Sequence, residues 1–349
     1  MRVLLERNDV NPDAADEYGR TPLCEAVENG HEGVVRIPLE RSDINPNTPD
    51  GNGEALLSLA AENGHEGVVR ILLERNDINP NTANTFFGQT PLYLATKNGH
   101  EEAVRILLGR NGINSNISDK YGQTPLSLAA RNEHEGVVRI VLERNDVNLD
   151  EVEKYRMTPL LNAAQNGHEG VVKILLERND VNPEGASRHN ETPLSLAAMW
   201  GHEGVVRMLL GRNDINPNAA GDDGQTPLSW AVQNGEEDVV RMLLERNDVN
   251  PNTTNKDGRT PLSFAAEMGD EKVVGMLLER KDINVDITDH NGQSAAEWAA
   301  QNGYDRIAEL LRDRAASTPR YAASLQPAAT RSPESSEPSE PPPKSIRRL

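Results

Sequence analysis

One block of residues recurs along nearly all of this 349-residue chain, and its regular spacing limits the possible folds more than any other feature. Successive copies of the block, which contains Gly-x-Thr-Pro-Leu and Gly-His-Glu-Gly-Val-Val, lie 34 residues apart, with a single step of 35. A period of this length indicates stacked units, none of which can bury its apolar face alone. We therefore predict one elongated array whose function lies on a long surface. The threonine position of the block falls at Thr21, Ala55, Thr90, Thr124, Thr158, Thr192, Thr226, Thr260 and Ser294.

Each copy carries signals for two helices and for the turns around them. In one copy, Gly122 suits a tight turn that needs a positive φ, and Thr124 can cap a helix that begins at Pro125. His134 opens a second helix, which carries one apolar stripe at Val137, Val138, Ile140 and Leu142 and is expected to stop at residues 144–146. We expect Asn145 to end that helix in the left-handed conformation, before an extended return to the next turn.

The repeated motif resembles that of a known family. Residues 224–231, Gly-Gln-Thr-Pro-Leu-Ser-Trp-Ala, match the ankyrin signature Gly-x-Thr-Pro-Leu-His-x-Ala. Tetratricopeptide repeats share the period but have little chain between helices, whereas here about ten residues rich in Asn and Pro separate the helical pairs. The resemblance implies an all-α solenoid of stacked helix-turn-helix units with short hairpin turns. Serine replaces the signature histidine in several copies, so the family's local Thr to His bond must be remade by serine or lost.

The register of the copies predicts where the parts of the chain begin and end. We expect a truncated half repeat at 1–15, nine repeats over 16–315 and a disordered tail rich in proline and serine at 316–349. Pro38, inside a helix, and Ala55, in place of threonine, predict a weak N-terminal end. The expected repeats are 16–49, 50–83, 84–118, 119–152, 153–186, 187–220, 221–254, 255–288 and the C-terminal cap 289–315.

Two functions are consistent with such an array. The ankyrin resemblance implies a non-catalytic scaffold or adaptor that binds a protein partner on its concave face. The version of the repeat found here, with Ile-Asn-Pro-Asn and Gly-His-Glu-Gly-Val-Val, also resembles the ankyrin arrays of fungal receptors that carry a NACHT-type NTPase domain. Because the chain starts inside a half repeat, the alternative is the recognition array of such a receptor, truncated at its N-terminus.

Composition and charge exclude several classes of partner. The formal net charge of −19 argues against nucleic acid and against anionic membrane surfaces. The sequence contains no run of about 18 apolar residues, which a membrane-spanning helix would need. A single cysteine, Cys24, cannot form an internal disulfide and suits a reducing compartment. We therefore expect a monomer in the cytoplasm, with the nucleus as a second possibility.

No pattern in the sequence predicts catalysis, a cofactor or a metal. The chain has no phosphate-binding loop, zinc-protease motif or serine-hydrolase motif. Equivalent residues of stacked helices lie about 10 Å apart, too far for the repeated histidines to share one metal ion, so we expect these histidines to have structural roles at helix starts. In seven successive repeats, from Arg36 to Arg241, a basic residue of the second helix follows a glutamate by four residues, which predicts ion pairs on an exposed face. The histidines are His31, His65, His100, His134, His168 and His202.

Aromatic residues at unusual positions are the best candidates for partner binding. Phe86 and Phe87 accompany the only insertion, in a turn that either protrudes or folds back over Tyr93. Trp200 stands where most copies have asparagine, so we expect it to face solvent. In the last three repeats aromatic residues replace the usual leucine two positions after Thr-Pro-Leu, and either packing or binding can explain them. With a tyrosine at a turn tip, the candidates are Phe86, Phe87, Tyr121, Trp200, Trp230, Phe264 and Trp298.

Overall fold

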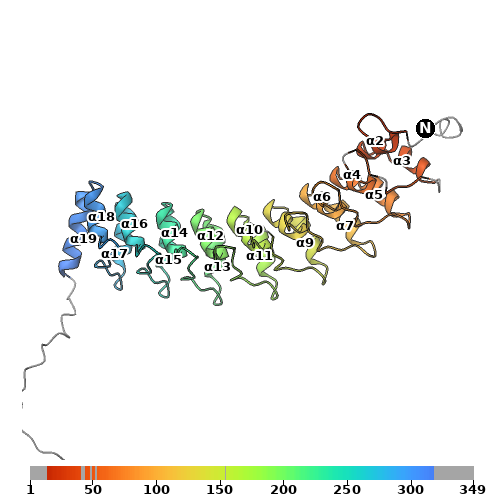
Figure 1. The fold of residues 1–349 in the computed structure, drawn as a ribbon. Coiled ribbons are helices and arrows are strands. Elements are labelled where there is room, and N and C mark those ends of the chain that lie inside the picture. The colour runs from red at the N-terminus through yellow and green to blue at the C-terminus, as the bar shows by residue number, and fades with distance from the viewer. Residues whose placement is uncertain (1–13, 41–43, 48, 52, 154, 318–349) are drawn as a thin grey trace, which may run out of the picture.

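The computed structural model describes residues 14–317, except 41–43, 48, 52 and 154. The described residues form pairs of short antiparallel helices stacked into a long curved array, which confirms the predicted all-α repeat fold (Figure 1). Most of the half repeat expected at 1–15 and nearly all of the tail expected at 316–349 lie outside the described residues. The last helix continues to Ser317, two residues beyond the expected end of the array.

The first helices of the repeats lie side by side along the inner side of the curve, and the second helices form the outer row (Figure 1). The first helices are α2 (Pro22–Glu28), α4 (Leu56–Glu62), α6 (Pro91–Lys97), α8 (Pro125–Arg131), α10 (Pro159–Asn166), α12 (Pro193–Met199), α14 (Pro227–Gln233), α16 (Pro261–Met268) and α18 (Ala295–Gln301). The second helices are α3 (Glu32–Leu39), α5 (Glu66–Leu73), α7 (Glu101–Leu108), α9 (Glu135–Leu142), α11 (Glu169–Leu176), α13 (Glu203–Leu210), α15 (Glu237–Leu244), α17 (Glu271–Glu279) and α19 (Asp305–Ser317).

Threonine and proline start the first helices as predicted. The Oγ1 atom of Thr124 accepts a hydrogen bond from the backbone N–H of Ser127 at 3.2 Å, and proline occupies the first turn. The hydroxyl of Ser127 donates to the carbonyl oxygen of Thr124 at 3.0 Å, so serine does remake a local bond. Where Ala55 replaces threonine, the buried hydroxyl of Ser58 has no hydrogen-bond partner.

The apolar core runs through the whole array without a break. Leucine, valine and alanine side chains of each helix pair pack against the pairs on both sides, from Leu23 in α2 to Leu311 in α19. Each repeat therefore depends on its neighbours for burial, as expected for a quasi-one-dimensional stack. Pro38 lies next to the last residue of α3, so it interrupts only the final turn of that helix.

The repeated histidines join neighbouring repeats. Each lies just before a second helix, but none makes a side-chain cap bond. Instead, Nε2 of His168 lies 2.8 Å from the carbonyl oxygen of Arg131, at the end of α8, the first helix of the preceding repeat. A carbonyl can only accept, so the histidine Nε2–H donates. The same bond links His65 to Glu28, His100 to Glu62, His134 to Lys97 and His202 to Gln165.

Asn145 does not have the predicted left-handed conformation. Among the described residues other than glycine, a positive φ occurs only at Glu133, Arg156 and Asn190. The segment is held instead by Arg144, whose guanidinium bonds Asp146 and also donates to the carbonyl oxygen of Leu108 in the previous repeat at 3.1 Å. Equivalent arginines bond an aspartate two residues later and a leucine carbonyl of the previous repeat; they are Arg75, Arg178, Arg212, Arg246 and Arg280.

Asparagines tie the extended returns together. The side-chain amide of Asn116 donates to the carbonyl oxygen of Asp146 at 2.6 Å, and its oxygen accepts from the backbone N–H of Asn148 at 2.9 Å. Asparagine can do both because it carries a donor and an acceptor. This pair of bonds also occurs at Asn47, Asn81, Asn218 and Asn252.

The ion pairs on the outer row differ from the prediction. The structure pairs no described arginine of this row with the glutamate four residues before it. Most pairs of this row bridge successive repeats, as between Arg36 and Glu74 at 3.2 Å and between Arg70 and Glu102 at 2.6 Å. The cause lies in the stacking, because the early glutamate of one helix packs over the glycine of the next, as Glu32 does over Gly67.

Candidate protein-binding surface

The hairpin turns before the first helices form a continuous edge of the array. In the turn at 119–123, one carboxylate oxygen of Asp119 accepts hydrogen bonds from the backbone N–H groups of Tyr121 and Gln123, at 2.8 and 2.9 Å. Neighbouring turns are linked directly, because the N–H of Lys120 donates to the carbonyl oxygen of Phe87 at 2.8 Å. We call these turns and the exposed side of the first helices the hairpin face.

The inserted turn presents both phenylalanines to solvent. Phe86 and Phe87 are exposed, so the alternative in which they fold back over Tyr93 is wrong. Tyr93 is buried, and its hydroxyl donates to the carboxylate of Asp119 at 3.0 Å. Burial, followed by the negative charge of Asp119, raises the pKa of Tyr93. The two rings therefore add exposed apolar surface to this turn.

Trp200 faces solvent as predicted, with 56% of its surface exposed. In most repeats this position, at the end of the first helix, is asparagine, whose amide donates to the last carbonyls, as Asn166 does to Asn162 at 2.8 Å. Trp200 cannot make this bond. Met268, in the same position two repeats later, is also exposed and also gives up the bond. Both side chains therefore replace a stabilising amide with exposed apolar surface.

The aromatic residues of the last two repeats have structural roles. Phe264 is only 5% exposed, which removes it from the candidates for partner binding. Trp298 is partly exposed, and its indole N–H donates to Asp289 at 3.1 Å. The guanidinium of Arg259 lies between the two rings, 4.2 Å from the centre of each. The cation that stacks on Phe264 and Trp298 is thus already supplied by the chain itself.

Trp230 occupies the same position but lacks such a partner. Its buried indole N–H makes no hydrogen bond. Trp298 bonds the residue nine positions earlier, whereas the residue nine positions before Trp230 is Gly221, which has no side chain. Trp230 is partly exposed and stays among the candidates.

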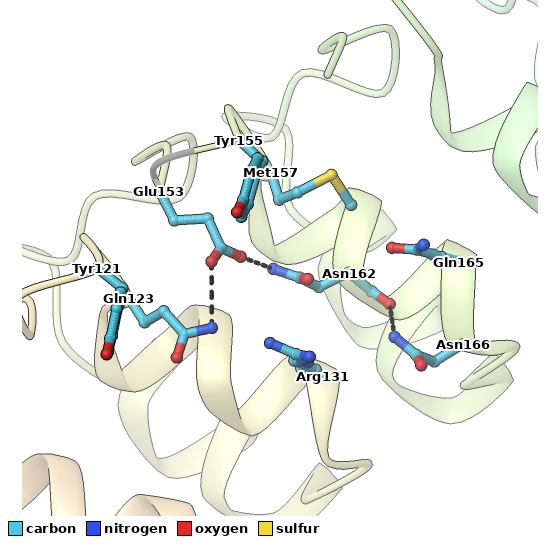
Figure 2. A pocket seen from close by; sticks show the side chains of 9 residues that line it. All are labelled: Tyr121, Gln123, Arg131, Glu153, Tyr155, Met157, Asn162, Gln165 and Asn166. Atoms are coloured by element: carbon cyan, nitrogen blue, oxygen red, sulfur yellow. Dashed lines mark hydrogen bonds between the residues drawn. The ribbon is translucent and has the colours of Figure 1, made fainter. Parts of the chain in front are cut away.

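A hollow of about 440 Å³ opens between the fourth and fifth repeats on the hairpin face (Figure 2). Tyr121 and Tyr155, both more than half exposed, stand at the tips of the two hairpins. Between them the carboxylate of Glu153, 8% exposed, accepts from the amide of Gln123 at 3.1 Å and from that of Asn162 at 2.9 Å. The other lining residues are Arg131, Met157, Gln165 and Asn166.

Sequence reasoning identified Tyr121 but missed Glu153 and Asn162. Both departures are visible in the repeats. Asn162 stands in the leucine position that holds aromatic residues later in the array, and Glu153 stands where most hairpins begin with aspartate or asparagine. Glutamate is one methylene longer, so its carboxylate reaches into the hollow instead of bonding the turn. Arg156 completes the unusual hairpin with a φ of 59°, in the position of the usual glycine.

Within the described residues, no group of three or more His, Cys, Asp or Glu side chains could hold a metal ion. In the same part of the chain, no helix is both long and apolar enough to span a bilayer.

Stacked helix pairs joined by projecting hairpins define the chain as a helical repeat solenoid. Its sequence matches the family model that describes three copies of the ankyrin repeat, over residues 1–84, 57–151, 144–220, 184–255, 212–289 and 228–320. The chain therefore belongs to the ankyrin repeat family, and its repeats imply a protein-protein interaction module. Nothing in it points to an enzyme. The comparison with curated proteins gives no match.

Proposed function

We propose that this chain is a non-catalytic adaptor that binds a protein partner on its hairpin face, along the inner side of the curve. The residues proposed to contact the partner are Phe86, Phe87, Tyr121, Trp200 and Trp230. Exposed aromatic side chains dominate the energetics of protein interfaces, because each buries a large area on binding. The net charge of −19 favours a partner with a basic surface over a nucleic acid.

Trp200 carries this proposal. Asn166, its equivalent one repeat earlier, lines the hollow beside Tyr155, so repeat symmetry puts Trp200 on the same face. The position normally holds an amide that ends the helix, and the tryptophan replaces that amide with exposed apolar surface. A residue that gives up a local bond and leaves a large aromatic surface exposed is best explained by a contact outside the chain.

The test is affinity capture from the native cell with the wild-type chain and two variants. Trp200→Ala should weaken capture of the main partner at least about tenfold, as expected for a hot-spot tryptophan. Its unfolding free energy should change by no more than about 1 kcal/mol, because the side chain is mostly exposed. Leu310→Ala is the matched control, since Leu310 is an exposed apolar residue on α19, in the outer row. Unfolding of the Trp200 variant, or undiminished capture, would refute the proposal.

The alternative, a recognition array detached from a NACHT-type receptor, rests on the repeat resemblance alone. The coding sequence upstream of Met1 decides between the two, because an open frame with a nucleotide-binding motif would support the receptor. We also propose that the chain is monomeric and cytoplasmic. Sedimentation of the purified chain and imaging of a fluorescent fusion test these two points separately.

A further inference from the structure

The hollow between the fourth and fifth repeats is lined by the carboxylate of Glu153, which forms no ion pair with any described residue. Glu153 is buried, as is Asp119 in the preceding hairpin, which also forms no ion pair within the described residues. Glu153 is held only by the neutral amides of Gln123 and Asn162, and Asp119 by turn N–H groups and the hydroxyl of Tyr93. Buried carboxylates are normally paired with a cation, because their desolvation is costly.

The two hydrogen bonds to Glu153 leave room for another partner. Each carboxylate oxygen accepts one amide bond, Oε2 from Gln123 and Oε1 from Asn162, whereas a carboxylate offers about four acceptor positions in all. One lone pair on each oxygen is therefore left over. Figure 2 shows the carboxylate directed into the hollow, with the rings of Tyr121 and Tyr155 on either side.

The residues that build this arrangement weaken the repeat they stand in. Asn162 replaces an apolar residue at a buried position, and Arg156 takes a left-handed φ of 59° that costs a residue with a side chain about 1 kcal/mol. Strain and buried polar groups of this kind gather at binding sites. That several departures from the repeat pattern meet at one hollow points to a ligand there.

We propose that this hollow receives an arginine side chain of the protein partner. Its planar guanidinium matches both free carboxylate positions of Glu153 and can stack on the rings of Tyr121 and Tyr155. Lysine offers a single point charge and should bind more weakly. The inference rests on the proposed function, because it names the group by which a partner would engage the hairpin face.

Among the described residues that line the hollow, Arg131 is the one cation, so its substitution is informative. Its exposed guanidinium forms no ion pair in the described part of the chain. If the hollow is made for the partner's arginine, then Arg131→Gln removes a like charge and should strengthen binding about two- to fivefold.

The test is a chemical-shift titration of the full chain with capped pentapeptides Ala-Ala-X-Ala-Ala, in which X is Arg, Lys, Gln or Glu. The side-chain amides of Gln123 and Asn162 report directly on the hollow. The Arg peptide should shift both, the Lys peptide should shift them less, and the Gln and Glu peptides should leave them unchanged. Equal shifts with the Gln peptide, stronger shifts with the Glu peptide, or none with Arg would overturn the inference.

Substitutions in and around the hollow test whether the Arg peptide binds there. Glu153→Gln keeps the size of the side chain and should weaken Arg-peptide binding at least about tenfold. Tyr121→Ala and Tyr155→Ala change side chains that are more than half exposed and should each weaken it severalfold, which keeps the test valid if Glu153→Gln unfolds. The matched controls are Glu177→Gln, which removes one exposed negative charge elsewhere, and Tyr18→Ala, at the tip of an earlier hairpin. Neither control should change the affinity.

Failure of this inference is separable from failure of the proposed function. If no Arg peptide binds but the cell partner is still captured and is lost with Trp200→Ala, the adaptor function stands and the hollow is not its arginine site. If the Arg peptide binds but Trp200→Ala has no effect on capture, the assignment of the hollow as an arginine site is supported and the proposed role of Trp200 is wrong.

Discussion

The stacked arginine at the C-terminal end allows a quantitative test of what holds the last repeats together. Arg259 is largely buried between Phe264 and Trp298, 4.2 Å from each ring centre, and its guanidinium also bonds the carboxylate of Glu267. Arg259→Met keeps most of the apolar stem and removes the charge. The expected result is a lower free energy of unfolding of repeats eight and nine.

The magnitude follows from three contributions. Two desolvated cation–π contacts are worth about 1–2 kcal/mol each. The ion pair with Glu267, which is about one-third exposed, adds only about 0.5 kcal/mol after solvent screening. Against these, the Nε–H of Arg259 is buried without a partner, and methionine relieves that penalty of about 1–2 kcal/mol. We therefore expect a net loss of about 2 kcal/mol.

A double-mutant cycle separates the stacking from the other contributions. Trp298→Leu removes one ring, and its coupling with Arg259→Met should be about 1 kcal/mol, measured by urea unfolding. Hydrogen exchange should show lost protection in α16 to α19 and unchanged protection in α4 to α7, because each repeat contacts only its neighbours. Lys256→Met, which removes an exposed cation on the same hairpin, is the control. A coupling below about 0.3 kcal/mol would refute the stacking argument.

Three further predictions concern stability. Ala55→Thr should raise the unfolding free energy of the N-terminal repeats by about 1 kcal/mol in urea unfolding, because it restores a helix cap and a partner for the hydroxyl of Ser58. Gly221→Asn should stabilise by about 0.5–1 kcal/mol by giving the indole N–H of Trp230 an acceptor; an unchanged midpoint would contradict this. Hydrogen bonding from Arg280 lowers the pKa of Asp282 in the folded chain, so its contribution is complete above the unfolded pKa of about 4 and is lost as pH falls through the lower folded value. In acid titrations followed by circular dichroism, the Asp282→Asn variant should therefore lose less stability than the wild type as the pH falls from about 4 to about 2.

Local signals made the helices of each repeat predictable. A threonine before proline, as at Thr124, is sufficient to place a helix start, because cap and helix lie within four residues. Contacts between repeats were harder to predict. The spacing of Arg144 and Asp146 is visible in the sequence, but the bond from Arg144 to the carbonyl of Leu108 spans 36 residues and depends on the stacking geometry. Asn145 was misassigned for this reason, since an intrinsic preference for left-handed backbone was weighed without the arginine that holds the segment.

The candidate surface was predictable to the extent that exposure follows from position. Trp200 was placed correctly because asparagine, its usual counterpart, is a surface residue. Phe264 and Trp298 could not be told apart from binding residues, because the residue that stacks on them, Arg259, belongs to a neighbouring hairpin. Glu153 was missed because its partner Asn162 lies nine residues away on the helix.

Departures from a repeat pattern divide into two kinds once the contacts are known. At each position the usual residue shows what stacking requires, so an unusual residue either finds a new partner within the chain or leaves a bond unmade. Trp298 finds Asp289 and Arg259, and its substitution should cost stability. Trp200 is bonded to no described side chain and is more than half exposed, and Glu153 finds only neutral donors for a full negative charge. A partner that covers an aromatic ring and supplies a cation accounts for both departures.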